Sequence, residues 1–205
     1  MLVDGMATMF GLDRAPVEAT GRGEHPQLAK LYAELAGASF GGGLYRVHTP
    51  ETGRRWTAVV EAAFPSMAGR IACFGSDWLG RQFALDRERR RGKYHLVLLL
   101  EPGTGDALEI PATVSSLHTD ELVNQADAAL ALDFYADWRE ATGDEDFLDP
   151  DECVGYDVPP FLGGSDDLDN LTRIDMERYW SVAGQLLQGT AELPPGATIG
   201  DVARR

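Results

Sequence analysis

The side chains that most often carry catalysis are spread along this chain without a recognisable arrangement. Its four histidines are His25, His48, His95 and His118. They share no metal-ligand spacing, and Cys73 and Cys153 do not form a C-x-x-C pair, so a zinc site is not indicated. No G-x-S-x-G nucleophile motif occurs. Folding could still bring Cys153, His118 and an aspartate together as a triad, but nothing favours this over an inert buried thiol.

Three further patterns resemble ligand-binding motifs only in part. Gly41–Gly43 lack the following Lys-Ser/Thr of a phosphate-binding loop, so we interpret them as a bulged entry to a strand. Gly103 and Gly105 have Leu108 where a dinucleotide fingerprint needs its third glycine, which favours a turn. The acidic run 144–152 lacks the glycine and glutamate positions of a calcium loop. We therefore expect no cofactor, no metal and no enzymatic activity.

Charge is the most uneven property of the sequence. The formal net charge is −15; residues 1–100 carry 13 Lys+Arg and 10 Asp+Glu, whereas residues 101–205 carry 5 and 23. Such a surface disfavours direct nucleic-acid binding and either serves solubility or attracts a basic protein partner. The basic run 87–93 lacks interleaved aromatic residues and is typical of a solvated hairpin connection. The candidate partner-binding residues are Asp144, Glu145, Asp146, Asp149, Asp151, Glu152, Asp166, Asp167 and Asp169.

The hydrophobic pattern of the first half predicts helices alternating with strands. Helices are expected over 26–36 and, capped by Thr49 or Glu51, up to Phe64. A short strand is expected over 44–48. Strand-like alternation appears on either side of a predicted turn at 75–77.

The run LVLLL (96–100) suits a strand buried on both faces, and 107–110 suits its partner, which Pro111 ends.

The second half is predicted to be mainly helical. Thr119 or Asp120 is expected to cap a short helix, and a longer helix is expected to reach Ala141 with an apolar stripe of Leu130, Phe134 and Trp138. A last helix is expected over 175–187, capped by Asp175. The fold class is α+β: a central, mostly antiparallel sheet flanked by helices, with the C-terminal helical half packed on it.

Several segments together resemble a known bacterial family. They are SFGGGLYRVH, FGSDWLGRQFALD, LEPGTGDALEIP, and CVGYDVPPFLGG followed by DDLDNLTRIDMERYWSVAGQL. The chain resembles type VI secretion immunity proteins, which join a GAD-like N-terminal region to a C-terminal immunity domain and are grouped beside the SUKH (Smi/Knr-like) immunity proteins. The resemblance spans about residues 37–188. It implies an α+β fold without enzymatic activity, and the neutralisation of a toxic effector, often a nuclease, by direct binding.

The resemblance also suggests how the chain is divided. The expected parts are an N-terminal tail (1–24), a GAD-like α+β half (25–115), an immunity-domain half packed on the first (116–190) and a flexible tail (191–205). The acidic second half and the resemblance agree, because an acidic face can fill the basic cleft of a nuclease.

Other functions remain open at the level of sequence. A small-ligand or regulatory domain would use a pocket near Arg46, Trp78 and Tyr156, and an enzyme with an unrecognised motif or a homodimer is also compatible with the residues. No apolar run approaches the ~20 residues that span a bilayer, and the start lacks a basic n-region with a long apolar stretch. We therefore expect a cytoplasmic protein without membrane contact.

Overall fold

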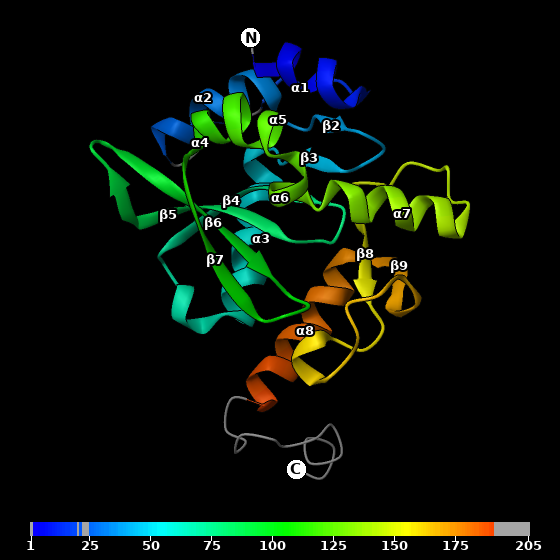
Figure 1. Cartoon of the computed structure of the whole chain (residues 1–205). Helices are drawn as coiled ribbons and strands as arrows, with labels where there is room; N and C mark the ends of the chain where they lie inside the picture. Colours follow the sequence, from blue (N-terminus) through cyan, green and yellow to red (C-terminus); the bar gives the residue numbers. More distant parts are fainter. Residues whose placement is uncertain (1, 20, 22–24, 191–205) are drawn as a thin grey trace.

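An antiparallel sheet whose strands follow one another in chain order forms the centre of the molecule (Figure 1). The computed structural model describes residues 2–19, 21 and 25–190. Within them, seven strands form this sheet and two more form a separate hairpin. The strands of the main sheet are β1 (Leu12–Arg14), β2 (Ser39–Phe40), β3 (Tyr45–Val47), β4 (Ile71–Asp77), β5 (Gln82–Arg91), β6 (Tyr94–Glu101) and β7 (Asp106–Thr113). The hairpin pairs β8 (Glu152–Tyr156) with β9 (Leu171–Asp175).

Helices cover both faces of the main sheet, which confirms the predicted α+β class. One face packs against α1 (Leu2–Phe10), α2 (Pro26–Leu35) and the segments that follow β7. The other face packs against α3 (Pro50–Ala63) and α8 (Met176–Thr190). The segments after β7 are α4 (Val114–Ser116), the π-helical η2 (Leu117–Glu121), α5 (Leu122–Asn124), α6 (Ala126–Leu130) and α7 (Leu132–Thr142). Short 3-10 turns are η1 (Pro65–Met67), η3 (Pro160–Leu162) and η4 (Leu168–Asn170).

Strand β6 shows how one apolar run serves two cores. Val97 and Leu99 belong to the core beneath α1 and α2, whereas Leu98 and Leu100 belong to the core beneath α3 and α8. All four side chains are buried, because successive residues of a strand point to opposite faces. The prediction of a strand buried on both faces is confirmed.

The helix α3 begins where the sequence predicts. Thr49 and Thr52 form a capping box, with the backbone N–H of Thr52 donating to Oγ1 of Thr49 at 3.1 Å. Trp56 and Val60 then face the core, where Trp180 of α8 joins them. The indole N–H of Trp180 donates to the backbone oxygen of Gly80 at 2.7 Å, so α8 is fixed to the turn between β4 and β5.

That turn lies later in the chain than the predicted one at 75–77. Gly75, Ser76 and Asp77 are the buried last residues of β4, and the chain reverses between Trp78 and Arg81. Asp77 organises the reversal: one carboxylate oxygen accepts from the backbone N–H of Leu79 and of Arg81, and the other accepts from Nε of Arg81 at 2.5 Å. Ser76 and Asp77 favour a turn by residue type, whereas in the structure both are buried and Asp77 pairs with Arg81.

The N-terminal segment also differs from the expectation. The predicted tail 1–24 includes α1, whose Met6 is fully buried, and β1, which pairs with β2 through Leu12 and Phe40. The glycine- and charge-rich composition hid this small edge strand. The other predicted tail, 191–205, lies outside the described residues. The division into halves at 115/116 stays a prediction.

Two helix predictions need correction in detail. The long helix predicted to reach Ala141 is interrupted at Ala131, which has φ 51° and separates α6 from α7. The cap before the shorter helices is Thr113, not Thr119 or Asp120, and β7 continues through Pro111 to that cap. Gly143 ends α7 in the left-handed conformation, which is common for a glycine after the last turn of a helix.

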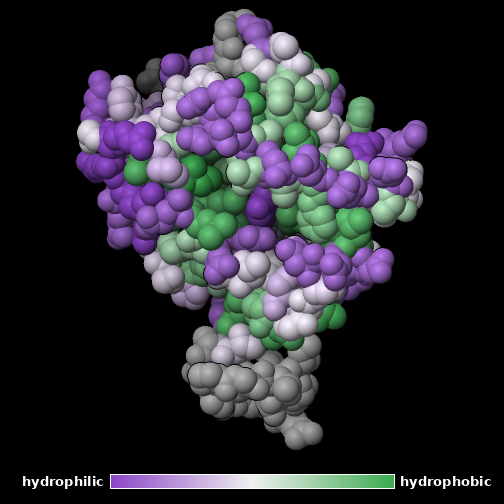
Figure 2. All heavy atoms as spheres, viewed as in Figure 1, coloured by the Kyte–Doolittle hydropathy of each residue, from purple (hydrophilic) through white to green (hydrophobic). Residues whose placement is uncertain are grey.

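The basic run 87–93 belongs to the hairpin of β5 and β6, whose tip is at Gly92. In Figure 2 it forms part of the hydrophilic projection at the left of the molecule. Arg91 donates to the backbone oxygen of Pro111 at 2.7 Å, and Arg89 pairs with Glu109 at 3.2 Å. The predicted hairpin connection is therefore present, with its strands extended into the basic run.

Candidate functional site

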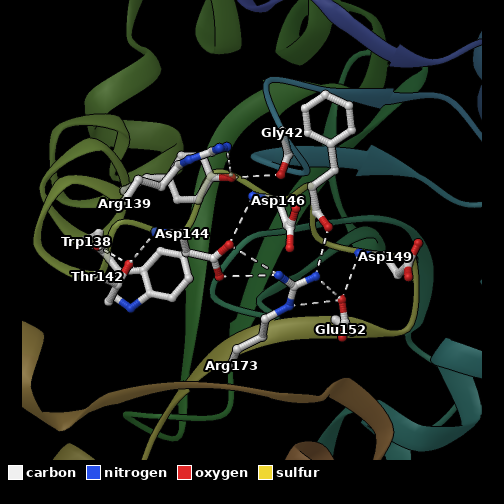
Figure 3. Close-up of polar contacts among 11 residues, drawn as sticks. Gly42, Trp138, Arg139, Thr142, Asp144, Asp146, Asp149, Glu152 and Arg173 are labelled. Atoms are coloured by element: carbon white, nitrogen blue, oxygen red, sulfur yellow. Dashed lines mark hydrogen bonds and ion pairs between the residues drawn. The ribbon is translucent and has the colours of Figure 1, made fainter.

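The loop between α7 and β8, residues 143–151, carries most of the acidic candidates and is held at three points. The first is Arg173 on β9 (Figure 3). Its Nη2 donates to the carboxylate of Glu152 at 2.6 Å and to the backbone oxygen of Phe147 at 2.9 Å, while Nη1 pairs with Asp144 at 3.3 Å. The hydrogen bond from Arg173 lowers the pKa of Glu152. We call residues 144–152 the acidic loop.

The second anchor is Arg46 on β3, whose side chain is only 4% exposed. Its Nη1 donates to the backbone oxygens of Asp149 and Glu152, both at 2.6 Å, and its Nη2 to that of Asp77 at 2.7 Å. Burial lowers the pKa of Arg46, which the nearby acidic groups oppose. Arg46 thus ties the end of the acidic loop to the main sheet.

The third anchor is the glycine run Gly41–Gly43, which lies in the left-handed region with φ of 66°, 73° and 90°. The backbone oxygen of Gly42 accepts from the N–H of Leu148 at 3.1 Å. The N–H groups of Gly42 and Gly43 donate to the carboxylate of Asp13 at 2.9 and 3.0 Å. A phosphate-binding role for these glycines was rejected on sequence grounds; their N–H groups in fact bind a carboxylate of the same chain.

Gly43→Ala is expected to destabilise the protein more than Gly69→Ala. Both glycines have positive φ, so both variants incur a strain of about 1–2 kcal/mol. A Cβ at Gly69 would meet nothing within 4 Å, whereas one at Gly43 would lie 2.7 Å from Cβ of Leu148. Overpacking of this kind adds about 1–3 kcal/mol.

Urea unfolding of both variants measures the difference, and limited proteolysis reports cleavage within the acidic loop. Equal losses in the two variants would show that contact with Leu148 does not hold this loop.

The nine acidic candidates fall into two groups. The acidic loop leads into β8 and ends at its first residue, Glu152, whereas residues 166–169 lie in the connection between β8 and β9. In the register of the hairpin, Glu152 pairs with Asp175 at one end and Tyr156 with Leu171 at the other. The structure therefore places the two groups at opposite ends of the hairpin, about 13 Å apart along a five-residue strand.

Several of these carboxylates are already bound within the chain. Asp144 and Glu152 pair with Arg173, Asp151 pairs with Arg55 at 2.9 Å and Asp149 lies 3.8 Å from Arg14. Asp166 accepts a hydrogen bond from the hydroxyl of Tyr156 at 2.5 Å. In the part of the chain that the structure describes, four candidates make no ion pair: Glu145, Asp146, Asp167 and Asp169.

An aromatic side chain in the acidic loop was missed by the sequence analysis. Phe147 is 61% exposed, directly beside Glu145 and Asp146, and Arg173 fixes its backbone oxygen. Its neighbour Leu148 is buried, so the loop inserts one apolar side chain into the core and presents the other to solvent. The only sequence signal was the placement of Phe147 within a run of acids, outside any helical or strand periodicity.

The three residues proposed for the alternative pocket, Arg46, Trp78 and Tyr156, lie in different surroundings. Trp78 is fully buried, and its indole N–H donates to the backbone oxygen of Leu130 at 2.8 Å. The ring of Tyr156 lies against Gly103. Arg46 lines a cavity of about 150 Å³ that neither Trp78 nor Tyr156 lines.

The candidate triad of Cys153, His118 and an aspartate is not assembled either. His118 lies 2.9 Å from the hydroxyl of Tyr45 and 2.7 Å from the backbone oxygen of Val114. Cys73 and Cys153 are free and buried, and burial raises the pKa of Cys73 to about 12 and that of Cys153 further above its ordinary value. Across residues 2–19, 21 and 25–190, no cluster of metal-ligating side chains occurs. No helix in those ranges is long and apolar enough to cross a bilayer.

A sheet that carries a rigidly held acidic loop with a protruding aromatic side chain is an arrangement suited to binding a protein partner. Residues 116–187 match the family model described as the C-terminal region of the type VI secretion system (T6SS) immunity protein Tdi1. The match includes the acidic loop.

A solved structure and the curated proteins give two further comparisons. The crystal structure of Atu4351 from Agrobacterium tumefaciens aligns with a TM-score of 0.53 and 16% identity, covering 89% of this chain and 88% of that chain. At this identity the similarity concerns the fold alone. No curated protein matches the chain.

Proposed function

We propose that this chain is a cytoplasmic immunity protein that binds and neutralises a toxic effector of a type VI secretion system. The observation that carries the proposal is the match of residues 116–187 to the immunity-protein family model. In this proposal residues 116–190 supply the surface that contacts the effector. The GAD-like half, residues 25–115, supplies the sheet on which that surface is held.

The acidic loop is the surface that we assign to the contact. Glu145 and Asp146 make no ion pair in the described structure, and the next residue, Phe147, is an exposed aromatic anchor. Arg46 and Arg173 hold the loop before any partner arrives, so little conformational entropy is lost on binding. Charges at the rim accelerate association, and a central aromatic residue supplies affinity. Asp166, Asp167 and Asp169, at the far end of the hairpin, add to the attraction at longer range.

The chemistry of this surface favours a nuclease as the effector. A nuclease presents a basic cleft to the phosphodiester backbone, and an acidic loop with an aromatic tip can occupy that cleft in place of the substrate. The proposal thus specifies a basic protein partner and no direct contact with nucleic acid.

Capture and activity measurements test the proposed function. The tagged protein is used to capture partners from its native cells at low and at moderate salt, and mass spectrometry identifies them. We expect a basic polypeptide that is toxic when expressed alone, tolerated when co-expressed with this chain, and inhibited in a DNA or RNA cleavage assay at a 1:1 ratio. A captured polypeptide whose toxicity is unchanged by co-expression would exclude the immunity role.

Charge reversal tests the assigned surface. Glu145→Lys with Asp146→Lys is expected to weaken effector binding by about 10- to 100-fold, mainly through slower association, and to reduce its salt dependence. The matched control is Asp106→Lys with Asp120→Lys, which changes the net charge equally at exposed residues outside the loop.

Phe147→Ala is measured in the same series and is expected to increase the dissociation rate instead. Surface plasmon resonance at two salt concentrations gives both rates. If the control pair weakened binding as much as the loop pair, the loop would not be the contact.

A further inference from the structure

A cavity of about 150 Å³ lies beside the second anchor of the acidic loop. Its walls come from β2, β3 and β4, from the N-terminus of α3, and from Pro150 and Asp151 of the acidic loop. The polar residues that matter for its chemistry are Arg14, Arg46, His48, Thr49, Ser76 and Asp151. The volume exceeds that of a single water molecule several-fold.

Two buried polar atoms at this cavity have no hydrogen-bond partner among the described residues. They are Nε of Arg46 and Oγ of Ser76, whose residues are 4% and 1% exposed. Arg46 and Ser76 face each other across β3 and β4, so both side chains lie on the same face of the sheet. An unsatisfied buried donor costs about 1–3 kcal/mol, which indicates that a bound group supplies the missing acceptor.

The electrostatics of the cavity favour a single negative charge. The guanidinium of Arg46 is bonded only to neutral backbone oxygens. The acidic side chains around it are bound elsewhere: Asp77 to Arg81, Glu152 to Arg173 and Asp151 to Arg55. Arg46 therefore retains one positive charge that no side chain in this part of the structure neutralises.

Two further groups agree with an anion. The cavity touches Thr49 and Thr52 at the start of the 14-residue helix α3, where the helix dipole is positive. Burial lowers the pKa of His48 to about 4, so this residue is neutral at pH 7. Its Nε2 lies 2.8 Å from Oε1 of Gln82. The site thus offers the guanidinium of Arg46 and a few hydrogen-bonding groups within a small volume. The other charged residues that line it are Arg14, which lies 3.8 Å from Asp149, and Asp151, which pairs with Arg55.

We propose that this cavity binds a small monocarboxylate, with one carboxylate oxygen accepting from Nε of Arg46 and the other from the hydroxyl of Ser76. A planar carboxylate matches two donors on neighbouring strands, and its single charge balances that of Arg46. The cavity holds a chain of a few carbon atoms beside Trp56. Because Pro150 and Asp151 close one side, the bound carboxylate stabilises the acidic loop. The site stands independently of the proposed contact with a toxin.

Ligand titration of the full chain tests this site. Sodium acetate, propionate and butyrate are compared with sodium phosphate and with sodium chloride at equal ionic strength, by thermal shift and isothermal titration calorimetry. We expect the carboxylates to raise the melting temperature in a saturable manner that chloride does not reproduce. No saturable effect would show that the cavity holds water only, and a larger effect of phosphate would overturn the assignment to a monocarboxylate.

Ser76→Ala separates the site from general salt effects. We expect the variant to fold and to be at least as stable as the wild type without ligand, because it removes an unsatisfied hydroxyl. We also expect it to bind the carboxylates at least about 10-fold more weakly. Ser66→Ala, at an exposed residue of η1, is the matched control and should bind as the wild type does. Equal carboxylate affinity in Ser76→Ala and the wild type would overturn the proposal.

Discussion

Lowering the pH from 6.5 to about 4 is expected to destabilise the protein by about 3 kcal/mol for each of two buried histidines. Burial lowers the pKa of His48 and of His118 from 6.5 to about 4. In this window the unfolded chain binds more protons than the folded chain, so stability falls as the pH falls. A total of this size is comparable with the whole stability of many domains.

The contacts of His118 explain why its neutral form is required. The carbonyl of Val114 can only accept, so Nδ1 carries the proton and Nε2 accepts from the hydroxyl of Tyr45. Protonation of Nε2 would leave two donors facing each other in the core, and the hydroxyl of Tyr45 would need another acceptor.

Urea unfolding between pH 6.5 and pH 4.5 measures the effect. This range is chosen because carboxylates with a lowered pKa affect stability mainly below it. Glu152, whose pKa is lowered below its ordinary value of 4.5, is an example. His118→Gln removes one titrating group and is expected to halve the slope of stability against pH, although the variant starts from a lower stability. A stability that stays constant over this range would show that neither histidine is held neutral by the fold.

Asp77→Ala is expected to cost about 3–5 kcal/mol, because it leaves the buried guanidinium of Arg81 without its counter-ion. Asp77 is fully buried, and Arg81 is 8% exposed. Burial opposes the charge of Arg81, but Asp77 and the nearby Glu101 together outweigh it, so the pKa of Arg81 is raised. The same substitution also removes the two hydrogen bonds that the carboxylate accepts from the backbone N–H groups of Leu79 and Arg81 in the turn before β5.

Two further variants test the prediction for Asp77→Ala. Asp167→Ala, at an exposed residue, is the matched control and should change stability by less than about 0.5 kcal/mol. Asp77→Leu combined with Arg81→Met should recover much of the loss, since the main cost lies in the orphaned charge. A loss below about 1 kcal/mol for Asp77→Ala would show that water or another group compensates Arg81.

Local sequence patterns were sufficient to predict those elements whose determinants lie within a few residues of one another. The cap at Thr49, the strand over 96–100 and the cap at Asp175, which accepts from the N–H of Arg178 at 2.8 Å, all follow from spacing within a few residues. The break at Ala131 could not be predicted, because alanine gives no sign of the left-handed conformation that the fold imposes on it.

The sequence reveals which acidic residues make up the candidate site, but not how the fold holds them in place. The acids of residues 144–152 are visible as a run, yet their anchors Arg46 and Arg173 are set by contacts that sequence spacing does not reveal. Arg46 is 103 residues from Asp149. Ion pairs within the chain then decide which carboxylates remain available to a partner. Asp144 and Glu152 pair with Arg173, whereas Glu145 and Asp146 make no ion pair in the described structure.

The strictly sequential order of β1 to β7 has a consequence for how the protein is made. Every strand of that sheet pairs with its neighbour along the chain, so each hairpin can close as soon as its second strand leaves the ribosome. The sheet with α2 and α3 is complete by Thr113, before any part of the acidic loop has been synthesised. Translation of the last third then adds β8, β9 and α8 onto a preformed platform. The acidic loop is thus among the last parts of the molecule to be positioned, after the strand that carries its anchor Arg46 has been paired.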